Sequence, residues 1–300
     1  MLKSHFRALL TCAAVLGCAS MPAHAAMTAV GPVDANHGFP TWYQAAAPDP
    51  ATGLNSLQDI RLQPCFPGVG TPPATPPFCG VITPPDPTKP IHFPDNFLGE
   101  FFYWRALARV KTSSMTAFLV LATQGTFANA DAIPLDGQQI AFSRIRIKIS
   151  GLVPGAFYKI THPYGVGVST NVAVQGSKPL YLQADASGTI NATDNDGCGA
   201  VILPTCNFAA VETPGIPVGP WLVWDTYGKP FIAPPPPPGV VALDPNSGPP
   251  PGFIGDAVTP HKVVGSPTGN NFFKVEDING KVVLFTDLFT VTGELALTQP

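Results

Sequence analysis

The sequence predicts an all-β protein, an antiparallel β-sandwich with long Pro/Gly-rich loops. Three observations predict this class. The 300 residues include 37 prolines and 29 glycines, which interrupt long helices. About eleven segments have the composition of short strands, and almost none has helical periodicity. Hydrophobic residues make up 45% of the chain and charged residues 12%, which supports a buried core and excludes disorder caused by high charge.

The clearest strand is Arg144–Ile149, where three cations alternate with isoleucines as in a strand with one buried face. Ile140 and Phe142 have the opposite parity, so a bulge or break is predicted near Ser143. Met115–Thr123 is apolar on both parities, and its Thr and Val residues favour a buried central strand over a short helix. The other predicted strands are Asp59–Gln63, Glu100–Val110, Thr116–Phe127, Phe157–Thr161, Val166–Val174, Leu180–Ala184, Thr189–Thr193, Trp221–Trp224, Phe272–Glu276 and Val282–Leu295.

The first 25 residues have the three parts of an export signal. Lys3 and Arg7 precede the apolar run Ala8–Val15, and Ala23-His24-Ala25 is a small-x-small pattern that predicts cleavage after Ala25. Lipoprotein processing at Cys18 is the alternative. The apolar run is shorter than the ~20 residues that cross a bilayer as a helix. We therefore expect a secreted, periplasmic or cell-surface protein without a transmembrane span.

Residues 26–300 are expected to form one extended β-sandwich unit with Pro-rich loops at 65–90 and 233–252. Within the second loop, Pro234–Pro238 and Pro249–Pro251 are predicted to be solvated polyproline II. A domain boundary near Thr170 is the alternative.

Four cysteines follow the signal: Cys65, Cys79, Cys198 and Cys206. Four cysteines allow three pairings, and we expect the sequence-local pairs Cys65–Cys79 and Cys198–Cys206, each closing a short loop. The alternative is metal ligation. Neither pair has the two-to-four-residue gap of zinc sites, and export favours oxidation.

Charge argues against a nucleic-acid partner. The chain has 16 basic and 19 acidic residues, a net charge of −3, and loss of Lys3 and Arg7 with the signal makes it more negative. No basic cluster in the sequence is larger than Arg144, Arg146 and Lys148.

Catalytic motifs are absent from the sequence. It contains no Gly-x-Ser-x-Gly, no His-Glu-x-x-His, no phosphate-binding Gly-x-x-x-x-Gly-Lys loop and no dinucleotide fingerprint. His162, before the Pro163-Tyr164-Gly165 turn, is the one candidate for a hydrolase site, and a histidine bonded to turn backbone is the alternative. A pair of carboxylates for glycoside hydrolysis could be drawn from Glu100, Asp225, Glu276 and Glu294. Such a pair is recognised by the distance between its two carboxyl groups, which the sequence does not provide.

Two groups of residues are candidates for ligand binding. Asp194-Asn195-Asp196-Gly197 is predicted to be a tight turn in which Asp194 and Asp196 could bind calcium, and an ordinary β-turn is the alternative. Trp221 and Trp224 are three apart on a predicted strand and so point to opposite faces. At most one is then core, and the other is a candidate for stacking on a sugar ring.

The segment 151–158, Gly-Leu-Val-Pro-Gly-Ala-Phe-Tyr, resembles the Leu-x-Pro-Gly-x-x-Tyr corner of fibronectin type III and related immunoglobulin-like domains. The resemblance implies that Leu152 fills the core and that the Tyr158 hydroxyl bonds to upstream backbone. It also implies that the sandwich is of the immunoglobulin or fibronectin III type, and it implies nothing about a ligand.

More broadly, the chain resembles a group of secreted bacterial proteins of uncharacterised function. The resemblance implies no activity for this chain. The insertion at 234–251 departs from the pattern of the group. The resembling segments are Gly31–Asp34, Gly38–Tyr43, Phe101–Trp104, Arg144–Gly165, Gly252–Asp256, Asn271–Phe273 and Asp287–Gly293.

These observations predict a secreted, non-enzymatic cell-envelope or extracellular protein with an adhesive, matrix or surface-structural role. A carbohydrate-binding module that uses an exposed tryptophan is the alternative, and an extracellular hydrolase is a further one. The expected partner is a polysaccharide or a surface protein, with no cofactor other than the calcium considered above.

Overall fold

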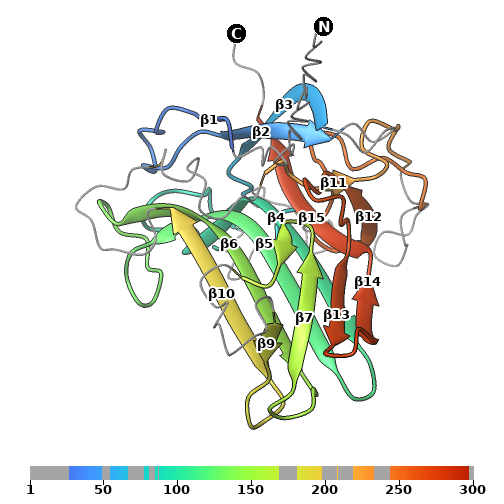
Figure 1. Cartoon of the computed structure of the whole chain (residues 1–300). Helices are drawn as coiled ribbons and strands as arrows, with labels where there is room; N and C mark the ends of the chain where they lie inside the picture. Colours follow the sequence, from blue (N-terminus) through green and yellow to red (C-terminus); the bar gives the residue numbers. More distant parts are fainter. Residues whose placement is uncertain are drawn as a thin grey trace, which may run out of the picture.

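The computed structural model (Figure 1) describes residues 27–48, 55–66, 78–80, 85–86, 88–168, 181–197, 208, 219–232 and 244–296. Within these ranges the regular elements are all β-strands, and every strand pair is antiparallel. The predicted all-β class is therefore confirmed. Several predicted features lie outside the described residues: the signal at 1–25 with Cys18, the Cys198–Cys206 pair, and the run Pro234–Pro238.

A ten-stranded sheet is the larger of two, in the order β1-β2-β3-β15-β4-β5-β6-β10, with β12 paired to β15 and β11 to β12. Figure 1 shows β4, β5, β6 and β10 side by side, while β2 and β3 cross one end of the sheet. Its strands are β1 Ala29–Val30, β2 Tyr43–Pro48, β3 Asn55–Gln63, β4 Glu100–Lys111, β5 Thr116–Phe127, β6 Gln139–Ser150, β10 Ile190–Gly197, β11 Val223–Trp224, β12 His261–Val264 and β15 Leu288–Leu295.

A five-stranded sheet lies against one face of the larger one (Figure 1). Its order is β14-β13-β7-β8, with β9 also paired to β7. The rings of Trp104 in β4 and Tyr164 in the β7–β8 turn meet edge to face, 6.0 Å apart, which fixes the side on which this sheet packs. Its strands are β7 Phe157–His162, β8 Gly165–Val166, β9 Tyr181–Gln183, β13 Phe273–Asp277 and β14 Val282–Thr286.

The apolar core includes residues of both sheets. Ile145, Ile147 and Ile149 of β6 are buried, and they belong to one apolar cluster with Ile160 of β7 and Val275 of β13. Successive residues of a strand point to opposite faces, so the alternating Arg144, Arg146 and Lys148 point away from the core. The predicted alternation is therefore confirmed, as is the strand, rather than helix, at β5.

The bulge predicted near Ser143 is wrong. β6 pairs with β5 without a register shift from Gln139 to Ser150, and the shift in this part of the sheet lies between Phe102 and Trp104 of β4. The physical reason is that Phe142 need not turn to the core to leave water, because the guanidinium of Arg144 covers its ring at 4.8 Å.

Strand boundaries also needed correction. The predicted strand Val282–Leu295 is two strands, because the chain leaves the small sheet after Thr286 and enters the large one at Leu288. Of Trp221–Trp224 only Val223–Trp224 is a strand, and of Val166–Val174 only Val166 belongs to one within the described residues. β1, β2 and β12 were not predicted.

The prediction that Pro249–Pro251 is solvated is wrong for two of its residues, since Pro249 and Pro250 are buried. Gly248 just before them donates its backbone N–H to the carbonyl of Pro230 at 2.9 Å. A side chain at Gly248 would overlap the Lys229 carbonyl, so two backbone segments approach closely here and bring the prolines into the fold.

Candidate functional site

The outer face of the large sheet carries five cations from two separate strands. Directly paired residues in a sheet point to the same side, and residues two apart on a strand share a face. The pairings therefore place Arg105 and Arg109 of β4 on the same face as Arg144, Arg146 and Lys148 of β6. We call this surface the arginine face, and it consists of three rows: Thr292, Arg105, Ala122, Arg144 and Asn195; Thr290, Leu107, Val120, Arg146 and Thr193; and Arg109, Phe118, Lys148 and Asn191.

No carboxylate belongs to these three rows. Arg144 reaches Glu100, outside the rows, with 3.7 Å between its guanidinium and the carboxylate. Among the described residues, Arg105, Arg109, Arg146 and Lys148 have no ion-pair partner. The face therefore carries an excess of positive charge, although the whole chain is slightly negative.

Three of the arginines are stacked on phenylalanine rings. The guanidinium carbon lies 4.7 Å from the ring centre for Arg105 over Phe102, 4.8 Å for Arg144 over Phe142 and 6.0 Å for Arg146 over Phe118. A guanidinium is attracted to the negative face of an aromatic ring, and the stack limits its rotation. These cations are therefore held in place by the sheet itself.

Burial and neighbouring cations destabilise the charged forms of Arg105 and Arg144. The pKa of Arg105 is lowered to about 10, chiefly by burial, which the charge of Glu100 opposes and the charge of Arg109 reinforces. Burial also lowers the pKa of Arg144, again opposed by Glu100 and reinforced by Arg146. A bound anion would lower the free energy of the charged forms of both guanidinium groups.

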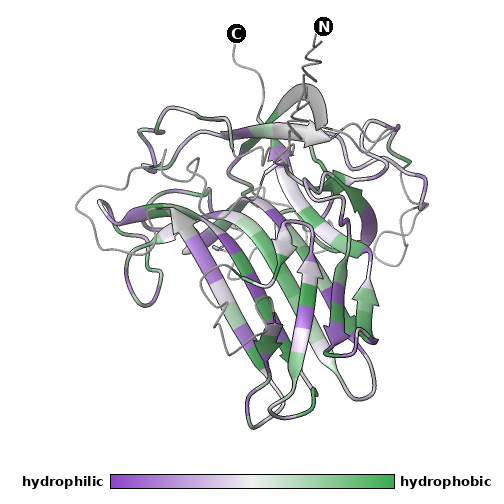
Figure 2. Ribbon diagram, in the orientation of Figure 1, coloured by the Kyte–Doolittle hydropathy of each residue, from purple (hydrophilic) through white to green (hydrophobic). Residues whose placement is uncertain are grey.

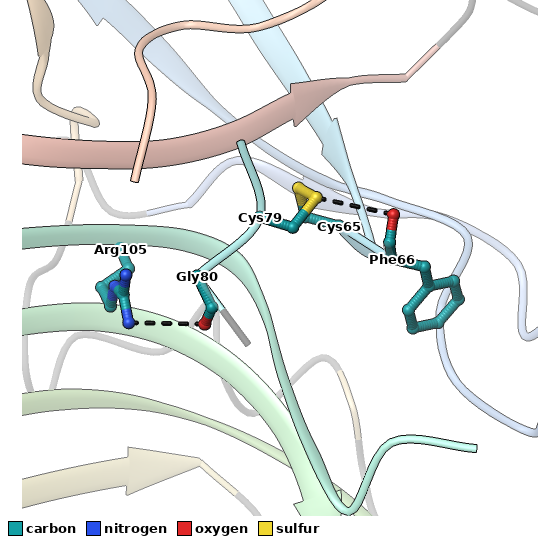
Figure 3. Close-up of a disulfide and its surroundings, with 5 residues drawn as sticks. All are labelled: Cys65, Phe66, Cys79, Gly80 and Arg105. Carbon is teal, nitrogen blue, oxygen red and sulfur yellow. Dashed lines mark hydrogen bonds between the residues drawn. A yellow bond between two sulfur atoms is a disulfide. The ribbon is translucent and has the colours of Figure 1, made fainter. Parts of the chain in front are cut away.

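Several buried polar atoms on this face have no hydrogen-bond partner. They are the Nε atoms of Arg105 and Arg146 and the hydroxyl oxygens of Thr290 and Thr292. Thr292 is fully buried beside Arg105, whose terminal nitrogen donates instead to the Gly80 carbonyl at 3.4 Å (Figure 3). Buried donors without partners are destabilising unless a ligand or water supplies the missing bond. These four atoms lie beneath the surface, so contacts with a bound anion would come from the exposed Arg109 and Lys148 and from the partly exposed Arg144 and Arg146.

The sequence identified only part of this face. Arg144, Arg146 and Lys148 were visible as one alternating run, but Arg105 and Arg109 were not connected with them. One signal was available: Arg105 and Arg109 are four residues apart in the predicted strand Glu100–Val110, so they point to the same face of it. The pairing through β5 that brings the two runs together is not readable from either run.

The expectation that at most one of Trp221 and Trp224 is core is wrong, because both are fully buried. Trp221 is not in a strand, so the alternation rule does not apply to it. Trp224 stacks on His261 with ring centres 4.6 Å apart. Neither indole offers an exposed face to a sugar.

The tight turn predicted at Asp194–Gly197 is also wrong. These residues are the last four of β10, paired with Phe142–Ile145 of β6. Asn195 points to the arginine face and accepts a hydrogen bond from Arg144 Nε at 2.9 Å, while Asp194 is 2% exposed on the opposite face. The backbone of these residues thus lacks the turn that motivated calcium, and calcium binding by Asp194 and Asp196 stays a prediction.

His162 is buried at the end of β7, bonded to turn backbone. Its Nδ1 accepts the Tyr164 N–H at 3.2 Å, which leaves the proton on Nε2, 2.6 Å from the Gly167 carbonyl oxygen. His162 is therefore a histidine bonded to turn backbone, which was the alternative to a hydrolase site. Its two ring nitrogens are both occupied by backbone groups, so neither is free to act as a general base.

We expect His162 to make stability fall with acidity. Burial lowers its pKa from 6.5 to about 4, and the bond to Gly167 opposes this only partly. Between these values the unfolded chain binds more protons than the folded chain, so the free energy of unfolding decreases as pH falls through this window, by at most ~3 kcal/mol. Urea unfolding at pH 7 and pH 4.5 measures the loss, and His162→Gln should reduce it. An NMR titration midpoint near 6.5 for His162 would contradict the prediction.

Leu152 and Tyr158, the two residues named in the corner resemblance, are both buried. The Tyr158 hydroxyl accepts the backbone N–H of Val153 at 3.1 Å. Cys65 and Cys79 form the predicted disulfide (Figure 3). The Cys79 sulfur is 3.6 Å from the Phe66 carbonyl oxygen, and since a disulfide sulfur carries no hydrogen this is a packing contact.

The carboxylates considered for glycoside hydrolysis are on different parts of the fold, and three of them have basic neighbours. Glu100 faces Arg144, Asp225 lies 3.2 Å from His261 Nδ1, and Glu276 lies 3.2 Å from Lys274 Nζ. Glu294 lies beside the disulfide, where burial raises its pKa, opposed by a hydrogen bond with Gln63. The geometry does not single out an acid–base pair.

Comparison with protein-family models, curated proteins and solved structures found no match. No helix within the described residues is long and apolar enough to span a membrane.

Proposed function

We propose that the protein is an exported, non-enzymatic cell-envelope or extracellular protein with an adhesive, matrix or surface-structural role, and that the arginine face is its attachment surface. The observation that carries this proposal is the gathering of five cations without a carboxylate in three rows of one sheet. Export is supported by the signal-like residues 1–25 and by the Cys65–Cys79 disulfide, since such bonds persist in oxidising compartments.

We also propose that the two facing sheets form a sandwich of the immunoglobulin or fibronectin III type. The hydrogen bond from the Val153 N–H to the Tyr158 hydroxyl and the apolar cluster shared by the two sheets support this proposal. The arginine face lies on the outer side of one sheet, where an extended partner can contact cations of two strands at once.

Retention on surfaces tests the attachment role. The purified protein, with disulfides formed, is incubated with insoluble polysaccharides, immobilised matrix proteins and phospholipid vesicles. We expect saturable retention on at least one surface, at least tenfold weaker for the variant Arg144→Gln/Arg146→Gln. Glutamine keeps a polar side chain and removes the charge, so the loss reports on electrostatic contacts.

The matched control is Arg61→Gln/Lys281→Gln, which removes two charges from other parts of the surface: Arg61 is exposed on β3, and Lys281 is exposed between β13 and β14. It should retain wild-type attachment. Equal retention of both double variants, or no retention of the wild type on any surface, would refute the role proposed for the arginine face.

A further inference from the structure

We propose that the partner of the arginine face is an acidic polysaccharide, a polymer whose sugars carry carboxylates, an inference that rests on the attachment role proposed above. The first argument is the distribution of charge. The exposed Arg109 and Lys148 flank Phe118, so they lie two strand spacings apart, roughly 10 Å, and Arg146 precedes Lys148 at about 7 Å along the strand.

This spacing suits a repeating anion. A single small anion would need the guanidinium groups to converge on one point, whereas these cations are spread in two directions across the sheet. A polymer with regularly spaced carboxylates can contact several of them at once, and each added contact strengthens attachment without further loss of translational freedom.

The second argument is the neutral polar groups among the cations. Asn191 and Asn195 are exposed at the β10 edge of the rows, and the partly exposed Thr193 lies between them on the same strand. Arginine binds carboxylates with paired hydrogen bonds, while amides and hydroxyls suit sugar hydroxyls. The face therefore matches a ligand that has both carboxylates and hydroxyls.

Other polyanions fit less well. Single-stranded nucleic acid is bound by stacking bases on exposed aromatic rings, and here the guanidinium groups cover Phe102 and Phe142. An anionic membrane surface is favoured by apolar side chains that insert beside the cations. The apolar members of the rows, Leu107, Phe118 and Val120, are partly buried between the cations. The large exposed apolar residues, such as Ile133 and Val153, do not belong to the three rows.

Binding to polygalacturonate, measured by calorimetry, tests the proposal against a matched neutral polymer, its full methyl ester. We expect saturable binding to polygalacturonate, at least tenfold weaker binding to the ester, and weaker binding as salt concentration rises. Arg144→Gln/Arg146→Gln should weaken binding to polygalacturonate at least tenfold, and Arg61→Gln/Lys281→Gln should not change it.

A second double variant distinguishes loss of binding from loss of the fold. Arg109 and Lys148 are exposed, so Arg109→Gln/Lys148→Gln should fold normally and weaken binding about threefold or more, a loss of roughly 0.7 kcal/mol or more. Unchanged binding in this variant, or equal binding of the acid and the ester, would overturn the proposal.

The remaining outcomes separate this inference from the attachment role. Arginine-dependent binding to single-stranded DNA or to phosphatidylglycerol vesicles, with none to polygalacturonate, would refute the polysaccharide and leave the attachment role standing. Absence of wild-type binding to all of these probes, together with no retention on any surface, would refute both.

Discussion

Replacing Trp104 with alanine should lower the free energy of unfolding by about 3–5 kcal/mol, the range typical of large aromatic side chains removed from a core. Trp104 is fully buried where the two sheets meet. Its indole N–H donates to the Leu222 carbonyl at 3.1 Å, and Tyr164, in contact with its ring, donates to the Pro220 carbonyl at 2.6 Å. The two aromatic residues together hold the segment at 220–222 against both sheets.

Trp104→Phe separates the two contributions of this side chain. It keeps most of the apolar volume and loses the bond to the Leu222 carbonyl, so we expect a smaller loss of about 1–3 kcal/mol. Urea unfolding followed by circular dichroism measures both variants. A loss below 1 kcal/mol for Trp104→Ala would show that this junction is not central to stability.

Removal of the Cys65–Cys79 disulfide should cost about 3 kcal/mol. The bond joins residues separated by 14 positions, and a closed loop of this length restricts the unfolded chain by roughly this amount. The double variant Cys65→Ser/Cys79→Ser is preferable to a reducing agent, because it removes this bond alone. Guanidinium unfolding of this variant and of the wild type measures the difference.

The same variant should weaken attachment through the arginine face. Gly80 follows Cys79, and its carbonyl accepts a hydrogen bond from Arg105 (Figure 3). Without the disulfide this segment loses an anchor, and Arg105 loses a fixed partner. A variant with unchanged stability and unchanged retention would show that the disulfide supports neither the fold nor the site.

The sequence was sufficient where a local pattern decided the structure. Strict alternation in Arg144–Ile149 predicted a strand with one buried face, and the short spacing of Cys65 and Cys79 predicted their pairing. It was insufficient where a neighbour decided the outcome. Phe142 stays on the outer face because Arg144 covers it, and Trp221 and Trp224 are both buried because the surrounding chain packs on all sides of them.

The sequence by itself determined that Arg144, Arg146 and Lys148 share one side of a strand, because side-chain alternation follows from backbone geometry within that strand. Only the tertiary structure decided that Arg105 and Arg109 join them. Their placement depends on the register of β4 and β6 against β5, and that register is set by packing between segments far apart in the chain. The arginine face is therefore a property of the paired sheet, which no one of its strands contains.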